Sequence, residues 1–144
     1  MSYRPYKDLK TSGIQLNYQN SSGSLITKGI PVCQKSSGII DFINVSVEAD
    51  VFAFIGIAGA NINDSATGPV ATNGRVENVT VIGNFGDPLY VSKTGGLTTS
   101  KPDIGVGGFL ALDFVLRVGV ITKNETNPSQ KDIVLDVQLV GQLW

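Results

Sequence analysis

Residues 86–99 read GDPLYVSKTGGLTT, and residues 28–40 carry a shorter echo of this stretch, KGIPVCQKSSGII. Each copy runs from Gly-x-Pro through an aliphatic residue to a Lys, and then to a glycine ahead of another apolar residue. Gly permits a positive φ, and Pro fixes φ at the first residue of a strand, where its missing N–H removes no ladder bond. Each copy therefore predicts a short strand, a tight turn and a returning strand.

Both copies continue to an apolar stretch that contains a glycine. Residues 54–58 read FIGIA, and residues 117–121 read RVGVI. A glycine inside a strand usually marks a bulge or a tight bend, which a small closed sheet requires. The order Gly-x-Pro, hairpin, glycine-containing strand thus occurs twice, and it predicts an internal pseudo-repeat whose copies form two halves of one barrel.

Alternation of polar and apolar residues predicts the other strands. Five stretches between Gly, Pro and Asn turn signals are predicted as strands: residues 44–51, 75–82, 88–92, 114–120 and 133–139. No window shows a sustained apolar period of 3.6 residues, which is the pattern of an amphipathic helix. Short strands broken by turns are typical of a sandwich or barrel rather than of alternating βα units. The predicted fold is all-β, a small antiparallel β-barrel or sandwich.

The same alternation assigns side chains to the two faces of the last strands. It places Phe114 and Leu116 in the core, and Asp113, Asp132 and Asp136 in solvent. Two carboxylates on one face could in principle serve glycoside cleavage. The chain has 12 acidic residues, so such a pair is expected by chance. We interpret these acids as solvated charges.

Composition limits the partners that the chain can bind. Of its 144 residues 42% are hydrophobic and only 16% are charged, with a formal net charge of −1. The charged share is low beside a typical value of about 25%, so part of the surface is expected to be covered by partners or kept soluble by uncharged polar groups. No Lys/Arg cluster is present that would release counterions from nucleic acid, which predicts no nucleic-acid partner.

The membrane and the secretory pathway are also not expected. The longest apolar stretches are far too short to cross a bilayer. The first residues, MSYRPYKDLK, are polar and lack the apolar core of a signal peptide. We therefore predict a protein that is made in a cytoplasm and has no membrane partner.

The chain contains no histidine and one cysteine, Cys33. The absence of histidine removes the commonest general base, the commonest metal ligand and every Ser-His or Cys-His arrangement. Cys33 lies in a predicted strand and is interpreted as a small buried side chain. On these grounds we predict no catalytic site and no cofactor.

Two further motifs are interpreted as loops. Residues 105–108 (GVGG) lack the Lys-Ser/Thr of a phosphate-binding loop, and no helix pattern follows them. Residues 61–65 (NINDS) contain possible oxygen ligands for Ca²⁺, but Asn and Asp in loops more often make their own turns. We predict no metal site in either.

Residues 1–24 are polar and rich in Ser, Asn and Gly, and we predict an N-terminal arm before a single β domain at residues 25–144. Two interpretations of the arm remain open. It is a flexible terminus, or it orders on a neighbouring molecule with Tyr3, Arg4 and Tyr6 as anchors, because Tyr and Arg are enriched at interfaces. Trp144 either plugs one end of a barrel or docks in a neighbour's pocket, and we favour docking.

The strings GDPLY (86–90), GLTT (96–99) and RVGV (117–120) resemble a pattern found in bacteriophage virion proteins. They are especially similar to the small capsid-associated proteins called capsid decoration or cement proteins. Those proteins typically read Gly-Asp-Pro-Val-Tyr, a short turn, Gly-Lys-Val-Thr, and later Ile-Gly-Val-Ala. The resemblance is closer over residues 86–121 and looser over residues 29–140. The long polar arm and an insert at residues 61–74 depart from the pattern.

The resemblance implies a non-enzymatic structural protein that binds the major capsid protein at the outer surface of the virion. It would be made in the cytoplasm of the bacterial host and would stabilise the shell as a homo-oligomer, with a trimer favoured because it suits local three-fold points. Two alternatives stay open: a tail, baseplate or fibre-base component, and a carbohydrate-binding attachment module. The last needs exposed aromatic platforms, for which Phe52, Phe54 and Tyr90 are the candidates.

Overall fold

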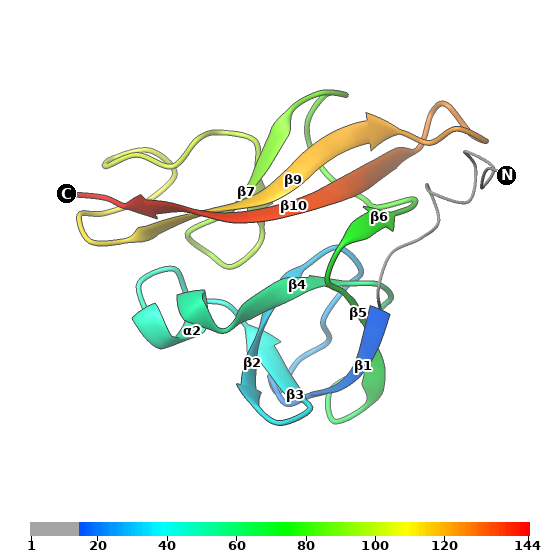
Figure 1. The fold of residues 1–144 in the computed structure, drawn as a ribbon, viewed down its shortest axis with the longest axis horizontal. Coiled ribbons are helices and arrows are strands. Elements are labelled where there is room, and N and C mark those ends of the chain that lie inside the picture. Colours follow the sequence, from blue (N-terminus) through cyan, green and yellow to red (C-terminus); the bar gives the residue numbers. More distant parts are fainter. Residues whose placement is uncertain (1–14) are drawn as a thin grey trace, which may run out of the picture.

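The computed structural model describes residues 15–144 and shows an almost entirely β fold (Figure 1). Ten strands and one short helix lie within these residues. In chain order they are β1 (Gln15–Asn20), β2 (Pro31–Ser36), β3 (Ile39–Phe42), α2 (Glu48–Phe52), β4 (Phe54–Ala58), β5 (Thr67–Ala71), β6 (Gly74–Val76), β7 (Pro88–Val91), β8 (Leu97–Thr98), β9 (Phe114–Lys123) and β10 (Lys131–Gln142). The predicted all-β class is confirmed.

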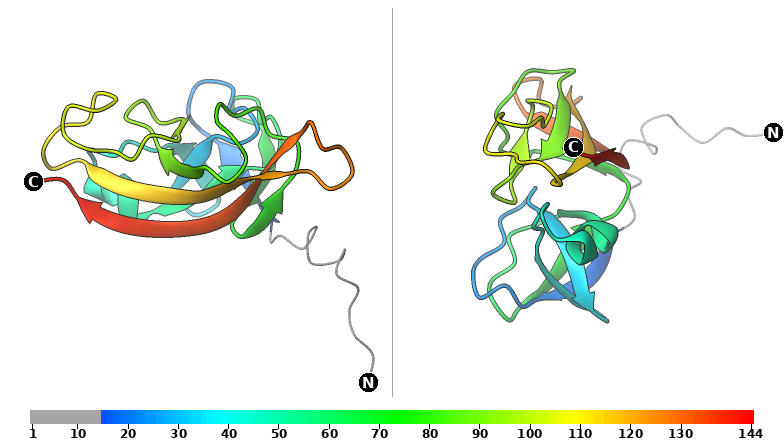
Figure 2. Two further views of the ribbon diagram at one scale, coloured as in Figure 1. Left: turned by 90° about the horizontal axis from the view of Figure 1, so that it is seen from above. Right: turned by 90° about the vertical axis from the view of Figure 1, so that its left-hand side faces the viewer.

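The strands form two five-stranded units that pack against each other (Figure 2). The first unit is a closed barrel in the order β1-β3-β2-β4-β5, in which β1 pairs parallel with β3 and antiparallel with β5. The second unit is a sheet in the order β6-β10-β9-β7-β8, and its end strands β6 and β8 do not pair with each other. The predicted barrel is therefore present, but it is built from the first half of the chain alone.

The first strand of the barrel lies inside the segment predicted as an arm. β1 pairs with β5 from Gln15 to Gln19, and Asn20 is buried with its side-chain amide bonded to the carbonyl of Ile62. The barrel therefore begins at residue 15 and not at residue 25. Residues 1–14, with the predicted anchors Tyr3, Arg4 and Tyr6, lie outside the described residues.

The two units repeat the same strand pairing. Val32 of β2 pairs with Gly56 of β4, and Leu89 of β7 pairs with Gly119 of β9. In both units the register shifts at the next residue of the Gly-x-Pro strand. The strand orders β3-β2-β4-β5-β1 and β8-β7-β9-β10-β6 then correspond one to one. The pseudo-repeat is present, although the prediction that its copies form halves of one barrel is wrong, because each copy makes its own five-stranded unit.

The strand glycines are required by the backbone of the adjacent strand. A Cβ added to Gly56 would lie 1.9 Å from the carbonyl oxygen of Ala71, and one added to Gly119 would lie 2.0 Å from that of Val134. Ala71 belongs to β5 and Val134 to β10, the corresponding strands of the two units. Only glycine allows this close approach of two backbones.

An ion pair is repeated as well. The Lys that stands four or five residues after the proline of Gly-x-Pro pairs with an Asp six residues before the strand glycine. In the first unit Lys35 pairs with Asp50, and in the second the Nζ of Lys93 lies 2.6 Å from the Oδ2 of Asp113. Each pair fixes the hairpin of its unit to the segment that leads into the glycine strand.

Two buried apolar clusters hold the molecule together. One fills the barrel and consists of Ile26, Val32, Ile40, Ala58, Ile62 and Val70. The larger one joins the outer side of the barrel to the second sheet, and it includes Cys33, Ile57 and Ala71 from the first unit with Leu89, Leu116, Val118, Ile121 and Ile133 from the second. Because this larger core draws on both units, they form one domain.

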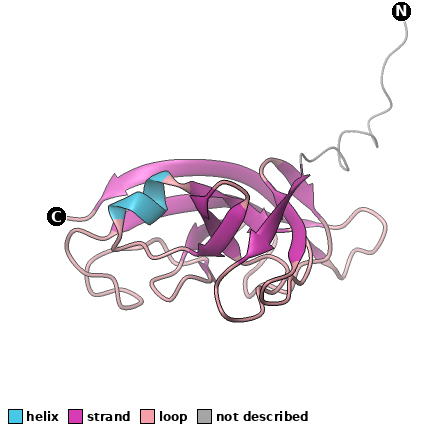
Figure 3. Cartoon of the chain, turned by 90° about the horizontal axis from the view of Figure 1, so that it is seen from below, coloured by secondary structure: helices cyan, strands magenta, loops and turns pink. Residues whose placement is uncertain are grey.

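The predicted strand at residues 44–51 is wrong. Residues 48–52 form α2, which lies beside the barrel (Figure 3). The side-chain oxygen of Asn44 accepts a bond from the N–H of Ser46, and the carboxylate of Asp50 accepts one from the N–H of Asn44. These bonds close a turn that an extended strand would open, while Val45 and Val51 still reach the core.

The strand predicted for residues 75–82 is only partly confirmed, since β6 ends at Val76. Asn78 has a positive φ of 54°, and its N–H donates to the buried carboxylate of Asp132 at 2.9 Å. The chain is thereby turned away from the sheet. The strands predicted at 88–92, 114–120 and 133–139 correspond to β7, β9 and β10.

The faces predicted for β9 and β10 need correction at two acids. Asp113 and Asp132 are buried and not solvated, whereas Asp136 is exposed as predicted. Each carboxylate accepts hydrogen bonds from segments distant in the sequence, such as Lys93 for Asp113 and Arg75 for Asp132, which alternation along one strand cannot indicate. Beyond Leu135 the register of β10 against β9 shifts twice, and Val137 lies partly exposed.

Candidate interaction surface

Trp144 follows the end of β10 and is 87% exposed. The interpretation that it plugs one end of the barrel is therefore wrong, while docking on a neighbour stays a prediction. Transfer of a large aromatic side chain out of water lowers the free energy. A largely exposed Trp is therefore unusual on a surface that no partner covers.

Other apolar side chains gather around the same end of β10. We call this group the end surface: Val106, Leu110, Leu112, Val140 and Trp144. The first three come from the loop between β8 and β9, which lies beside the last residues of β10 (Figure 1). All five side chains are more than 40% exposed.

Hydrogen bonds hold this loop against the end of β10. The N–H of Leu112 donates to the carbonyl of Leu143 at 2.7 Å, and the side-chain amide of Gln142 donates to the carbonyl of Leu112 at 2.8 Å. Val106 and Val140 line one groove of about 510 Å³ together with Val115. The loop and the end of β10 are therefore held together, and Val106 and Val140 of the end surface share one groove.

Asp113 anchors the loop from below. Its carboxylate accepts hydrogen bonds from the Nζ of Lys93 (2.6 Å), the N–H of Leu110 (2.9 Å) and the hydroxyl of Ser46 (2.8 Å). Burial raises the pKa of Asp113, but these three donors outweigh that effect and hold the pKa below its usual range. The loop is thus tied to both units, because Ser46 belongs to the first and Lys93 to the second.

The outer edge of β10 is open beside the end surface. β6 pairs with β10 only from Ile133 to Leu135, and no strand within residues 15–144 covers the outer edge of residues 136–142. From residue 132 to residue 144 the sequence contains no Lys, Arg or Pro, the residues that usually protect an exposed edge. This edge extends the area available to a protein partner.

A second concave feature lies where the second unit fails to close. We call it the seam groove; it has a volume of about 630 Å³ and is lined by Thr27, Lys28, Gly29, Ile30, Asn61, Asn78, Thr80, Val81, Ile82 and Leu97. In the first unit the corresponding seam is closed by parallel pairing of β1 with β3. Because β6 and β8 do not pair, the chain after β6 and the loop before β2 leave a groove beside Leu97.

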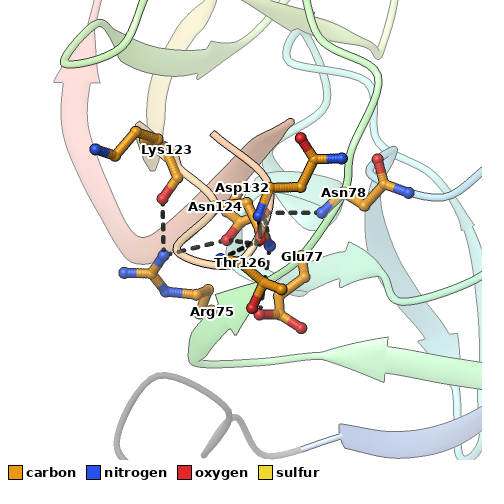
Figure 4. A network of polar contacts seen from close by, with 8 residues as sticks. Arg75, Glu77, Asn78, Lys123, Asn124, Thr126 and Asp132 are labelled. Atoms are coloured by element: carbon orange, nitrogen blue, oxygen red, sulfur yellow. Dashed lines mark hydrogen bonds and ion pairs between the residues drawn. The ribbon is translucent and has the colours of Figure 1, made fainter. Parts of the chain in front are cut away.

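A buried polar network lies close to the start of β10 (Figure 4). Asp132 is fully buried, and its carboxylate accepts bonds from the guanidinium of Arg75 (3.1 Å), the N–H of Asn78 (2.9 Å) and the side-chain amide of Asn124 (3.2 Å to each oxygen). Asn124 in turn accepts the N–H of Thr126 at 2.9 Å. Every acceptor position of Asp132 is occupied, so we interpret the network as structural.

The loop motifs considered from the sequence have structural partners of their own. Residues 105–108 form turns, with the N–H of Gly105 bonded to the carbonyl of Phe109. The side chain of Asn61 accepts the N–H of Lys28, and that of Asp64 accepts the N–H of Gly23. Within residues 15–144 no three His, Cys, Asp or Glu side chains are grouped so as to hold a metal ion.

Cys33 is fully buried, as predicted. Burial raises the pKa of its thiol to about 11, and the negative charge of Asp50 adds to the rise. A thiol with so high a pKa is a poor nucleophile at neutral pH.

No helix in the described part of the chain combines the length and apolar character that a membrane crossing needs.

The aromatic platforms of the carbohydrate interpretation are mostly covered. Tyr90 is buried, and Phe54 packs against the larger core. Phe52 is exposed, although its ring makes an edge-to-face contact with Phe114 at a centroid distance of 6.2 Å. Of the three candidate platform residues, only Phe52 therefore presents an exposed ring.

Sequence reasoning found Trp144 but missed the rest of the end surface and the seam groove. The loop residues Leu110 and Leu112 fit the alternating pattern of β9, which hid their exposure. The stretch without Lys, Arg or Pro after residue 131 was a usable signal for the open edge of β10. The seam groove depends on two strands failing to pair, for which one sequence carries no signal. A comparison with protein-family models and one with curated proteins found no match to this chain.

Proposed function

We propose that this chain is a structural virion protein of a bacteriophage, a capsid decoration or cement protein that binds the outer capsid as an oligomer. The observation that carries the proposal is the end surface, whose exposed apolar side chains are held in place by hydrogen bonds and lack a covering within residues 15–144. The resemblance of residues 86–121 to decoration proteins supplies the class of partner, the major capsid protein.

The backbone of Leu112 supports an assembly role for this surface. Leu112 has a φ of 74°, a conformation that costs an L-residue about 1–2 kcal/mol, and its side chain is more than half exposed. The larger core does not include it. Residues in sparsely populated backbone conformations cluster at functional sites, and on this ground we assign the exposed Leu112 side chain to the proposed contact.

Such a protein would act by mass action. A subunit that bridges neighbouring capsid proteins in the mature shell, and binds other shell states less tightly, stabilises the mature shell by its differential affinity. No chemistry at the bound surface is needed. A trimer is the oligomer that we favour, because a ring of three matches a local three-fold point of an icosahedral shell.

The tail, baseplate or fibre-base alternative uses the same surfaces and differs in the number of copies per particle. The carbohydrate-binding alternative is supported less, because two of its three candidate aromatic residues are covered.

The proposal is tested with capsids that lack this protein. Purified chain is added to them, bound protein is measured by co-sedimentation, and the capsid melting temperature is recorded. We expect saturable binding and a higher melting temperature. The variant Leu110→Asp should bind about tenfold more weakly, whereas Leu16→Asp, which places the same single charge at an exposed position of β1, should bind as the unchanged chain does. Absence of binding by the unchanged chain to its own capsids would contradict the proposal.

A further inference from the structure

Trp144 and the seam groove lie at opposite ends of the same strand. The groove borders the first residue of β10, since the N–H of Val79 donates to the carbonyl of Lys131 at 2.8 Å and the Nζ of Lys131 reaches the carbonyl of Val81 at 3.2 Å. Trp144 follows the last residue of β10 at the other end (Figure 1). Twelve strand residues span up to about 40 Å. The Trp144 side chain therefore cannot enter the groove of its own chain.

We infer that Trp144 of one copy inserts into the seam groove of a second copy. The groove volume of about 630 Å³ lies within the range of pockets that enclose organic groups, ~300–1,000 Å³. Ile30, Val81 and Leu97 supply apolar walls, and the side chains of Asn78 and Thr80 supply oxygen acceptors for the indole N–H. Trp is enriched among the few residues that carry most of the binding energy of protein interfaces, and these residues lie in well-packed, desolvated pockets.

We assign a second copy as the occupant because one chain exposes both the Trp144 side chain and the seam groove. Trp144 is 87% exposed at one end, and Ile82 at the groove is 92% exposed at the other. The contact removes apolar side chains of both copies from water, and a polar ligand in the groove would not bury apolar surface of its own. The groove exists only in the second unit, because the first unit closes its corresponding seam with β1 and β3.

The contact joins opposite ends of two copies, and this limits the assemblies that it can form. Two copies that exchange the contact reciprocally form a two-fold dimer, whereas a one-way contact closes into a ring or extends into a filament. A trimer is one such ring. The inference deepens the proposed function by naming the contact between subunits, which assigns Trp144 to the second copy and leaves the other four residues of the end surface to the capsid protein. It rests on that proposal only for its place in the virion.

The single Trp makes the contact directly measurable. Because Trp144 is the chain's one Trp, intrinsic Trp fluorescence reports on this side chain alone. We expect the emission to shift to shorter wavelength and acrylamide quenching to fall as protein concentration rises, in parallel with the mass measured by analytical ultracentrifugation. Ile82→Lys should stay folded, remain monomeric and keep the exposed emission. Leu16→Lys, the matched control on β1, should assemble normally. Unchanged Trp144 emission during assembly, or normal assembly of Ile82→Lys, would overturn the inference.

A mixing experiment tests the direction of the contact. Trp144→Ala retains a groove but no Trp, and Ile82→Lys retains a Trp but a blocked groove, so each alone should be monomeric. Their 1:1 mixture should form a heterodimer that does not grow further, since one productive contact remains. A mixture that stays monomeric contradicts the inference, as does self-association of Trp144→Ala.

Both measurements use the purified chain without capsids, so their failure is distinguishable from a failure to bind capsids. If Trp144→Ala loses capsid binding and still self-associates, Trp144 contacts the capsid protein and the contact between copies is wrong. If the unchanged chain does not self-associate and still binds capsids, the contact between copies is wrong and the proposed function survives without it.

Discussion

At the scale of single residues, Leu112 is the position where stability and the proposed capsid binding can be separated. Its positive φ is disfavoured for Leu and is tolerated by Asn. We therefore expect Leu112→Asn to leave the free energy of unfolding unchanged or to raise it by up to about 1 kcal/mol, while weakening capsid binding. Leu110→Asn, at a neighbouring exposed position without a positive φ, should weaken binding with no gain in stability. Urea denaturation and co-sedimentation measure the two effects. A loss of more than 1 kcal/mol in Leu112→Asn would mean that the leucine is needed for folding.

Asp132 and Asp136 stand on the same strand, and loss of their charges should change stability by very different amounts. Asp132→Asn leaves the guanidinium of Arg75, which is largely buried, without its ionic partner. We expect the free energy of unfolding to fall by about 3 kcal/mol. Asp136→Asn at an exposed position should change it by less than about 0.5 kcal/mol. Equal effects in denaturant titrations would show that the network in Figure 4 contributes little.

At the scale of strands, the glycine of β9 determines how closely β10 packs. Gly119→Ala places a Cβ 2.0 Å from the carbonyl oxygen of Val134, so the two backbones must separate. We expect a loss of about 3 kcal/mol, the upper range for overpacking, and a similar loss for Gly56→Ala in the barrel. Gly141→Ala is the control, because a Cβ there meets nothing within 4 Å. A tolerated Gly119→Ala in thermal unfolding would contradict the close packing described for both units.

The loop before β9 should make stability depend on acid pH. The folded pKa of Asp113 lies below its value in the unfolded chain, about 3.9. Its contribution is therefore present above the unfolded pKa and is lost as pH falls through the folded pKa. Denaturation from pH 6 to pH 2.5 should show a smaller loss for Asp113→Asn than for the unchanged chain, with Asp136→Asn resembling the latter. Parallel curves for Asp113→Asn and the unchanged chain would remove Asp113 as the cause.

The sequence predicts some elements better than others for physical reasons. The hairpins after Pro31 and Pro88 were predictable, because Gly, Pro and Lys at fixed spacing encode local turns. Residues 44–51 were not, since their alternation is also satisfied by a turn and the short helix α2, which side-chain bonds of Asn44 and Asp50 stabilise. Burial of Asp132 depends on residues distant in sequence, Arg75 and Asn78, so no local pattern could indicate it.

At the scale of the whole molecule, two copies of one strand order have different outcomes. The first closes into a barrel, and the second stays an open sheet that shares its core with the barrel. The echo in the sequence encodes the hairpin and the glycine strand of each unit, but closure depends on whether the outermost strands meet. The seam groove is present because β6 and β8 of the second unit do not pair. It lies near the start of β10, and the end surface lies near the end of that strand. A molecule with a groove at one end and a displayed Trp at the other is suited to assembly.

The most direct test of the structural virion role is the number of copies of this chain per purified phage particle, measured by quantitative mass spectrometry against the major capsid protein. The proposed function predicts a copy number comparable to that of the capsid protein, because decoration sites repeat over the whole shell. A few copies per particle would contradict decoration and favour the tail or baseplate alternative. Absence from the particle would contradict a virion role altogether.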